Sequence, residues 1–159
     1  MNKYMDHVYV IPEDDANRQI ANGFVDHHGV RDRRIQVMPV AGGWRNVLKT
    51  FKDEYVQQLK GNPKVHVVML VDFDGHFDER RAEFEGEIPG EIKPRVFVVG
   101  SRTTPETLKN ALNKGFDVIG ECLASDCDAG TTAHWGHGEL AHNQPDRQRL
   151  EQAVKPFLF

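Results

Sequence analysis

The chain lacks several features that would assign it to a class. It has only two cysteines, Cys122 and Cys127, among 159 residues, too few for a scaffold held together by disulfides. It contains no apolar run long enough to span a membrane, and its first residues are polar where a signal peptide needs an apolar segment. These absences favour a cytoplasmic protein with no membrane partner.

A surplus of positive charge is also missing. The 20 lysines and arginines are outnumbered by 24 aspartates and glutamates, which gives a formal net charge of −4. Proteins that bind nucleic acid usually carry a basic face, so the composition does not by itself indicate such binding. A metal site is locally acidic, however, and an acidic balance is compatible with a metal-dependent enzyme that acts on nucleic acid.

What is present is the composition of a folded domain. Apolar residues make up 39% of the chain and charged residues 28%, and 159 residues suffice for one core. The sequence shows no internal repeat and no low-complexity segment. We therefore expect a single domain over residues 1–159, with a core over about 7–115 and a helical tail over about 116–159.

The strongest local signal is an apolar run from Val65 to Val71, which is followed by Asp72 and Asp74. A short run rich in β-branched residues is typical of a strand buried on both faces, as in parallel sheets. Side chains alternate along an extended segment, so we expect both carboxylates to point the same way. They would lie at the carboxyl end of a central strand, where open α/β sheets bind their ligands.

Predicted strands alternate with predicted helices along the chain. Apolar runs predict strands at residues 7–11, 34–40, 65–72 and 95–100. Apolar periodicity and capping residues predict a helix that opens with Glu13, a long helix over 44–60 and a helix capped by Thr104. The segment 75–93 is predicted to be a partly helical connection. In the tail, helices are predicted near 117–124, 133–142 and 146–154, the last of them stopped by Pro156. This order predicts a Rossmann-like, three-layer α/β sandwich with a four-stranded parallel sheet and a helical C-terminal tail.

Four acids follow the ends of predicted strands: Glu13, Asp72, Asp74 and Glu106. In a parallel sheet these ends lie at one edge, so acids far apart in sequence can meet there. Carboxylate oxygens suit Mg²⁺ or Mn²⁺, and such ions bind phosphate oxygens and activate water. Other interpretations stay open, because Glu13 and Glu106 also suit a first helical turn and the two aspartates suit a solvated strand end.

The order of these elements resembles the Toprim domain of bacterial primases, topoisomerases, small ribosomal-RNA maturases and overcoming-lysogenisation-defect nucleases. The resemblance covers about residues 7–115. It implies that Glu13 matches the family glutamate and that Asp72 and Asp74 match its D-x-D pair, as catalytic metal ligands. Glu106 would match an extra acid of the overcoming-lysogenisation-defect branch. One departure is Asp14, since the family glutamate is commonly followed by glycine.

The resemblance implies Mg²⁺-dependent hydrolysis or transfer at phosphodiester bonds of DNA or RNA, with Mn²⁺ as an alternative ion. The cations best placed to bind a phosphate backbone are Arg45, Lys49, Arg102 and Lys109. Because the net charge is −4, we expect weak binding of nucleic acid by the protein alone, and a protein partner such as an ATPase. The alternative is a non-catalytic subunit that keeps the fold and binds a partner.

A third interpretation comes from the sequence D-F-D-G itself, which looks like the first motif of haloacid-dehalogenase-type phosphatases. Asp72 would then be the nucleophile and Asp74 the general acid. Two observations disfavour this interpretation. His76 stands where that family has threonine, and the motif falls in the middle of the chain, which leaves few residues for the other motifs.

Two other patterns indicate a binding site less strongly. Cys122, Cys127, His134 and His137 have a spacing that could hold zinc, but the close C-x2-C pair of common zinc modules is absent, so buried thiols and surface histidines are the favoured interpretation. Gly42-Gly43 precedes a predicted helix and could bring backbone N–H groups to a phosphate. Since the G-K-[ST] sequence of a P-loop is missing, we favour a simple tight turn.

Overall fold

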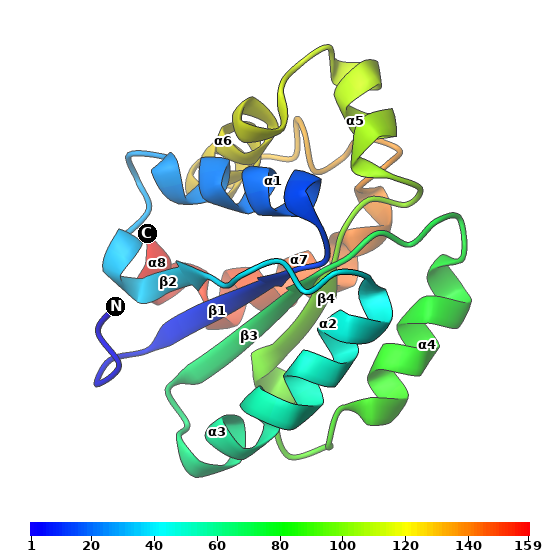
Figure 1. The fold of residues 1–159 in the computed structure, drawn as a ribbon. Helices are drawn as coiled ribbons and strands as arrows, with labels where there is room; N and C mark the ends of the chain where they lie inside the picture. Colours follow the sequence, from blue (N-terminus) through cyan, green and yellow to red (C-terminus); the bar gives the residue numbers. More distant parts are fainter.

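The computed structural model describes all 159 residues and contains one four-stranded sheet (Figure 1). Its strands are β1 (His7–Pro12), β2 (Ile35–Val37), β3 (Val65–Leu70) and β4 (Val96–Val99). All neighbours are parallel, in the order β2-β1-β3-β4. β3 lies inside the sheet, as its continuous apolar run predicts.

Helices cover both faces of the sheet, which confirms the three-layer α/β architecture. One face is covered by α1 (Asp15–Asp26), α6 (Phe116–Ala129), α7 (Gln144–Ala153) and α8 (Lys155–Leu158). The other is covered by α2 (Trp44–Thr50), α3 (Val56–Gly61) and α4 (Phe77–Glu87). A further helix, α5 (Pro105–Leu112), packs against α6 and α1 beyond the edge of the sheet. No helix of the structure is both long enough and apolar enough to span a membrane.

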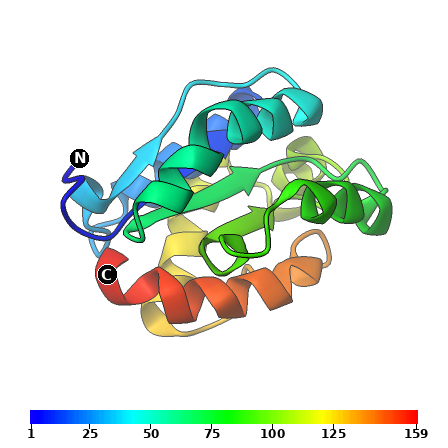
Figure 2. The same ribbon diagram turned by 90° about the horizontal axis from the view of Figure 1, so that it is seen from below.

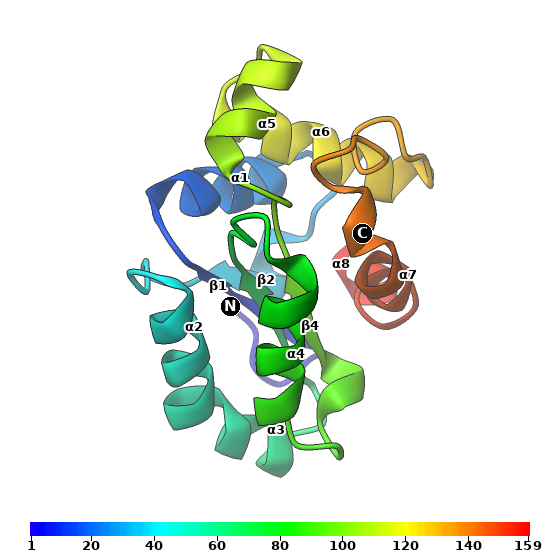
Figure 3. The same cartoon turned by 90° about the vertical axis from the view of Figure 1, so that its right-hand side faces the viewer.

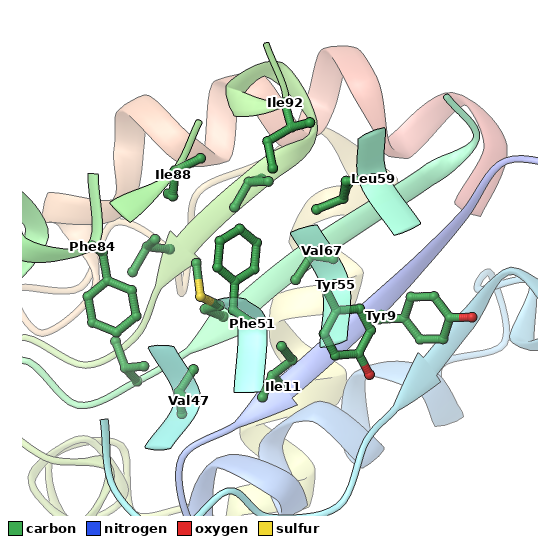
Figure 4. Packing of buried hydrophobic residues seen from close by; sticks show 14 of the residues in the cluster. Tyr9, Ile11, Val47, Phe51, Tyr55, Leu59, Val67, Phe84, Ile88 and Ile92 are labelled. Carbon is green, nitrogen blue, oxygen red and sulfur yellow. The ribbon is translucent and has the colours of Figure 1, made fainter. Parts of the chain in front are cut away.

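The side chains of the strands alternate between two cores. Tyr9 and Ile11 of β1 face α2 and α3, and Val67 of β3 joins them there (Figure 4). Val8 and Val10 face the opposite way, toward α1 and the C-terminal helices. This period of two is the alternation that an extended backbone imposes, and it explains why both faces of the central strands are apolar.

The predicted long helix over 44–60 is interrupted. A π-helical turn (Phe51–Tyr55) separates α2 from α3. Val47, Phe51, Tyr55 and Leu59 recur every four residues and are all buried. Four residues exceed one α-helical turn, so an unbroken helix would rotate each successive side chain by about 40° away from the sheet. The wider turn absorbs this drift and keeps all four side chains in the core.

Several predicted boundaries are wrong. β1 includes Pro12, and the following helix begins at Asp15 instead of Glu13. β2 and β4 are shorter than the predicted 34–40 and 95–100. Helix α6 runs well past the predicted 117–124, while 133–142 contains no α-helix. The predicted helix over 146–154 begins two residues earlier, at Gln144, and ends at Ala153, but Pro156 then lies in the first turn of a further short helix, α8, where proline is tolerated.

Helix α7 lies beside β4, which is an edge strand of the sheet (Figure 2). Asp146 accepts the backbone N–H of Val98 at 3.0 Å, and the Asn143 side chain both accepts from and donates to the backbone of Gly100. Asp146 also binds the Arg81 guanidinium of α4 through both oxygens. The tail thus satisfies groups that a fifth strand would otherwise pair, which protects the edge.

Candidate functional site

The order of the strands along the chain reverses between β1 and β3. From β1 the chain passes through α1 on one face to reach β2, and from β2 it returns through α2 and α3 on the other face to reach β3. Figure 3 views the molecule from the side at which the strands end. In open parallel sheets, ligands bind at such a reversal of strand order. Glu13 and Asp72 follow the two strands that flank it.

Glu13 and Asp72 are joined directly. The backbone N–H of Asp72 donates to Oε2 of Glu13 at 2.6 Å, and the backbone N–H of Glu13 donates to the carbonyl of Leu70 at 2.9 Å. Both acids are almost fully buried, at 8% and 7% exposure. Glu13 precedes the N-cap of α1, so the alternative of an acid in the first helical turn does not describe it.

Asp14 and Asn17 complete this cluster and were missed by the sequence reasoning. Asp14 is the N-cap of α1 and accepts the backbone N–H of Asn17 at 2.9 Å. The Asn17 side-chain amide donates to Asp14 at 2.9 Å and to Oδ1 of Asp72 at 2.8 Å. The capping pattern D-x-x-N at 14–17 was the available signal, but it could not show that the amide would reach a strand 55 residues away.

Burial and neighbouring negative charges raise the pKa values of two acids in this cluster. Burial, and then the nearby carboxylates of Asp14 and Glu13, raise the pKa of Asp72 to about 8, against the opposing hydrogen bond from Asn17. The pKa of Glu13 is raised as well, by burial first and then by the charges of Asp14 and Asp74. With a pKa of about 8, the Asp72 carboxyl holds a proton at neutral pH. A divalent cation could take the place of that proton, so the donor set fits Mg²⁺ or Mn²⁺.

Asp74 lies beside this cluster but is already paired. Its backbone is left-handed, with φ 49°, which ends the strict alternation assumed for the two aspartates. Arg80 of α4 donates through Nη1 to Oδ2 of Asp74 at 2.6 Å and to the carbonyl of Asp72 at 2.8 Å. The same guanidinium lies 4.6 Å from the ring centre of Trp44. Sequence reasoning missed Arg80, because its approach depends on how α4 packs.

Glu106 is not brought into the cluster by any contact. It lies exposed in the first turn of α5, where the helix dipole favours an acid, and it makes no hydrogen bond or ion pair. The ligand atoms of Glu13, Asp72 and Asp74 do not all lie within 4.8 Å of one another. An ion shared by these three acids would therefore require side-chain movement or bridging water.

The four predicted phosphate-binding cations have different surroundings. The Arg45 guanidinium lies 4.5 Å from the ring centre of Trp44, so it shares that indole with Arg80 of the cluster. Lys49 is paired with Asp53 of its own helical segment. Lys109 lies over the Phe116 ring, and the exposed Arg102 guanidinium makes no hydrogen bond or ion pair. Arg45 is thus the cation that contacts link most directly to the carboxylate edge.

The Gly42-Gly43 turn is used internally. The backbone N–H groups of both glycines donate to the carbonyl of Glu13, at 2.9 and 3.2 Å, so they are not free to bind a phosphate. Both glycines have positive φ, 85° and 110°, a conformation that other residues rarely adopt. The turn holds the backbone of Glu13 in place, in agreement with the interpretation as a tight turn.

The cysteines and histidines whose spacing could hold zinc do not form a group of converging ligands. The Lys114 ammonium lies 3.6 Å from Sγ of Cys122 and 3.3 Å from Nε2 of His134, which places a positive charge between these two groups. Burial raises the pKa of Cys127 to about 11, so that sulfur stays a thiol. Nδ1 of His137 accepts the N–H of Glu139. The geometry supports structural roles for these side chains.

Comparison of the chain with protein-family models, with curated proteins and with solved structures found no match. The resemblance to the Toprim domain therefore depends on the order of elements and on the acids at the strand ends. The parallel sheet with Glu13 and Asp72 at its reversal point is compatible with that resemblance.

Proposed function

We propose that this protein is a Toprim-like, Mg²⁺- or Mn²⁺-dependent enzyme that cleaves phosphodiester bonds of nucleic acid. The observation that carries the proposal is the buried Glu13–Asp72 pair at the reversal point of a parallel sheet, crowded by Asp14. Structural acids are rarely placed together without a compensating cation, because their mutual repulsion destabilises the fold. A function that employs a bound cation explains why three acids occupy this edge.

In this proposal Glu13 and Asp72 hold the ion, and Asn17 keeps Oδ1 of Asp72 oriented through its 2.8 Å hydrogen bond. Asp74 would be a third ligand if its ion pair with Arg80 opened. A bound divalent ion supplies charge neutralisation at the phosphate and lowers the pKa of a water. Arg80, stacked on Trp44 and once freed from Asp74, would donate to the non-bridging oxygens of the phosphate.

The surface charge favours cooperation with a partner. The net charge is −4, and Lys49 is neutralised by Asp53, which leaves Arg45, Arg102 and Lys109 as the predicted phosphate-binding cations without an acidic partner. Few phosphate contacts mean weak binding that falls further with salt. A basic or ATP-hydrolysing protein partner that supplies the missing contacts is therefore part of this proposal.

The test is cleavage of single- and double-stranded DNA and RNA by the purified protein with Mg²⁺ or Mn²⁺, and with EDTA. We expect cleavage only with metal, and a loss of about 100-fold or more in Asp72→Asn, since this change removes a ligand charge but keeps the shape. Glu83→Gln, which neutralises an exposed acid of α4, is the matched control and should cleave normally. Equal cleavage by all three proteins would remove Asp72 from the reaction.

One observation favours a second candidate, a non-catalytic subunit that binds a protein partner. The Arg80–Asp74 ion pair already neutralises one acid of the D-x-D pair without a metal. Protein that cleaves no nucleic acid and binds no Mn²⁺, yet co-purifies with one specific partner, would favour this candidate. A phosphatase that uses Asp72 as nucleophile is supported less, because that carboxylate is only 7% exposed and accepts from Asn17.

A further inference from the structure

A second group of potential metal ligands lies at the other end of α1 from the acidic cluster. His27 is the C-cap residue of α1, His28 follows it, and Asp128 lies in the last turn of α6. These residues are about 100 positions apart in sequence. The packing of α1 against α6 is what brings them together, and Figure 1 shows the two helices side by side.

Two glycines allow this close packing. A Cβ atom on Gly23 of α1 would lie 1.9 Å from the carbonyl oxygen of Asp117, and one on Gly120 of α6 would lie 2.0 Å from the carbonyl oxygen of Ile20. The two backbones are therefore in direct contact, which leaves no room for a larger residue at either position. Such contact fixes the position of the loop after α1 relative to the end of α6.

The three side chains form a compact group. One ligand atom each from His27, His28 and Asp128 lies within 4.8 Å of the others, and the two imidazole centres are 4.4 Å apart. This is the only such group of three in the structure. Gly29 makes room for the acid, because a Cβ there would lie 2.8 Å from Oδ2 of Asp128.

Ordinary surface pairing does not account for this group. The Asp128 carboxylate makes no hydrogen bond and no ion pair, although two imidazoles lie beside it. Nδ1 of His27 accepts the backbone N–H of Gly29 at 3.0 Å, so this nitrogen carries no proton, and its lone pair is engaged by that N–H in the metal-free protein. Imidazole binds metals in this unprotonated form, and an ion at Nδ1 would take the place of the Gly29 N–H.

We propose that His27, His28 and Asp128 bind a divalent transition-metal ion, with Zn²⁺ as the best match. Two imidazole nitrogens and one carboxylate favour Zn²⁺, Co²⁺ or Ni²⁺ over Mg²⁺, which prefers oxygen ligands. Three protein ligands leave the fourth tetrahedral position to water. Small rotations of the exposed His28 and Asp128 side chains bring the ligands to bonding distance. The site is independent of the phosphodiesterase proposal.

Titration calorimetry with ZnCl₂, in excess Mg²⁺ to occupy oxygen-rich sites, tests this proposal. We expect one Zn²⁺ per chain in the parent protein, and at least about tenfold weaker binding in His28→Gln and in Asp128→Asn. Glu121→Gln is the matched control, because Glu121 is an exposed acid of the same helix, two turns before Asp128. Asp72→Asn should also bind Zn²⁺ normally, which separates this site from the acidic cluster.

Two further measurements distinguish loss of a metal ligand from unfolding of the variant and from binding elsewhere on the protein. Thermal unfolding without metal should be unchanged in His28→Gln and Asp128→Asn, since both side chains are exposed and Asp128 is unpaired. The amide resonance of Gly29 should shift when Zn²⁺ displaces its hydrogen bond to His27. Equal Zn²⁺ affinity in Asp128→Asn and Glu121→Gln would overturn the proposal, as would loss of binding in Asp72→Asn alone.

Discussion

At the scale of single residues, Asp72 is held by three neighbours. Its backbone N–H donates to Glu13, its Oδ1 accepts from the Asn17 side chain, and its carbonyl accepts from Arg80. These contacts fix the carboxyl at the end of β3 in a buried position beside two other acids.

Burial and the charges of neighbouring acids raise the pKa of Asp72 from 3.8 to about 8. Between these values the folded protein holds a proton that the unfolded chain has released, so the free energy of unfolding falls as pH rises. We expect the free energy of unfolding of the metal-free parent, relative to that of Asp72→Asn, to fall from pH 4 to pH 8 by on the order of 2 kcal/mol. Denaturant unfolding at several pH values measures this difference.

The comparison isolates Asp72 from other titrating groups. Burial lowers the pKa of His66 and of His142, which makes stability rise with pH in the window where those histidines titrate. Both histidines remain in Asp72→Asn, so their effects cancel in the difference. Saturating Mg²⁺ should flatten the pH dependence of the parent alone. Parallel pH profiles for the two proteins without metal would show that the pKa of the Asp72 carboxyl is not raised.

The sequence predicts only part of this site. Asp72 was predicted because it ends an apolar run, and parallel sheets place such ends at one edge. Asn17 and Arg80 were not predicted, although they make the hydrogen bonds that orient the acids. Their positions depend on the approach of α1 and α4, which no local pattern in the sequence records.

At the scale of elements, the sequence predicts most reliably where local chemistry decides the structure. The helix capped by Thr104 begins with Pro105, as predicted, because both residues have strong local preferences. The π-helical turn after α2 and the full length of α6 were missed. The first depends on matching side chains to a sheet, and the second on contact between Gly120 and α1, so both are decided by tertiary packing.

Helix α7 is tied to the sheet through one buried acid. Asp146 is 1% exposed and accepts from Val98, Arg81 and Arg149. Asp146→Ala leaves the Arg81 guanidinium and the Val98 N–H without their partner, and we expect it to lower the free energy of unfolding by about 3–5 kcal/mol. Urea titration followed by circular dichroism measures the loss.

A matched control distinguishes this buried network from a simple helix-dipole effect. Asp78 also lies in a first helical turn, that of α4, but it is exposed and unpaired. We expect Asp78→Ala to cost about 1 kcal/mol at most, which is the range of a dipole interaction. Similar losses in the two variants would show that the Asp146 network contributes little beyond its position in the helix.

At the scale of the whole molecule, the two faces of the sheet are filled unequally. On the side of α2, α3 and α4, large side chains such as Phe51, Phe73 and Phe84 are completely buried. On the side of α1, α7 and α8, an apolar cavity of about 120 Å³ remains, with Val68 and Leu70 of β3 among its lining. The sequence could predict two apolar faces from the period of two, but not how completely each is packed.

Neighbouring valines of β3 provide a test of this asymmetry, because they point to opposite faces. Val68 lines the cavity, whereas Val67 is fully buried in the packed core. We expect Val68→Ile to raise the free energy of unfolding by about 0.5–1 kcal/mol, because the added methyl group fills empty space. Val67→Ile adds the same group where no space remains and should lower the free energy by about 1–3 kcal/mol. Chemical denaturation of the three proteins measures both changes, and a shift of the same sign in the two variants would contradict the unequal packing of the faces.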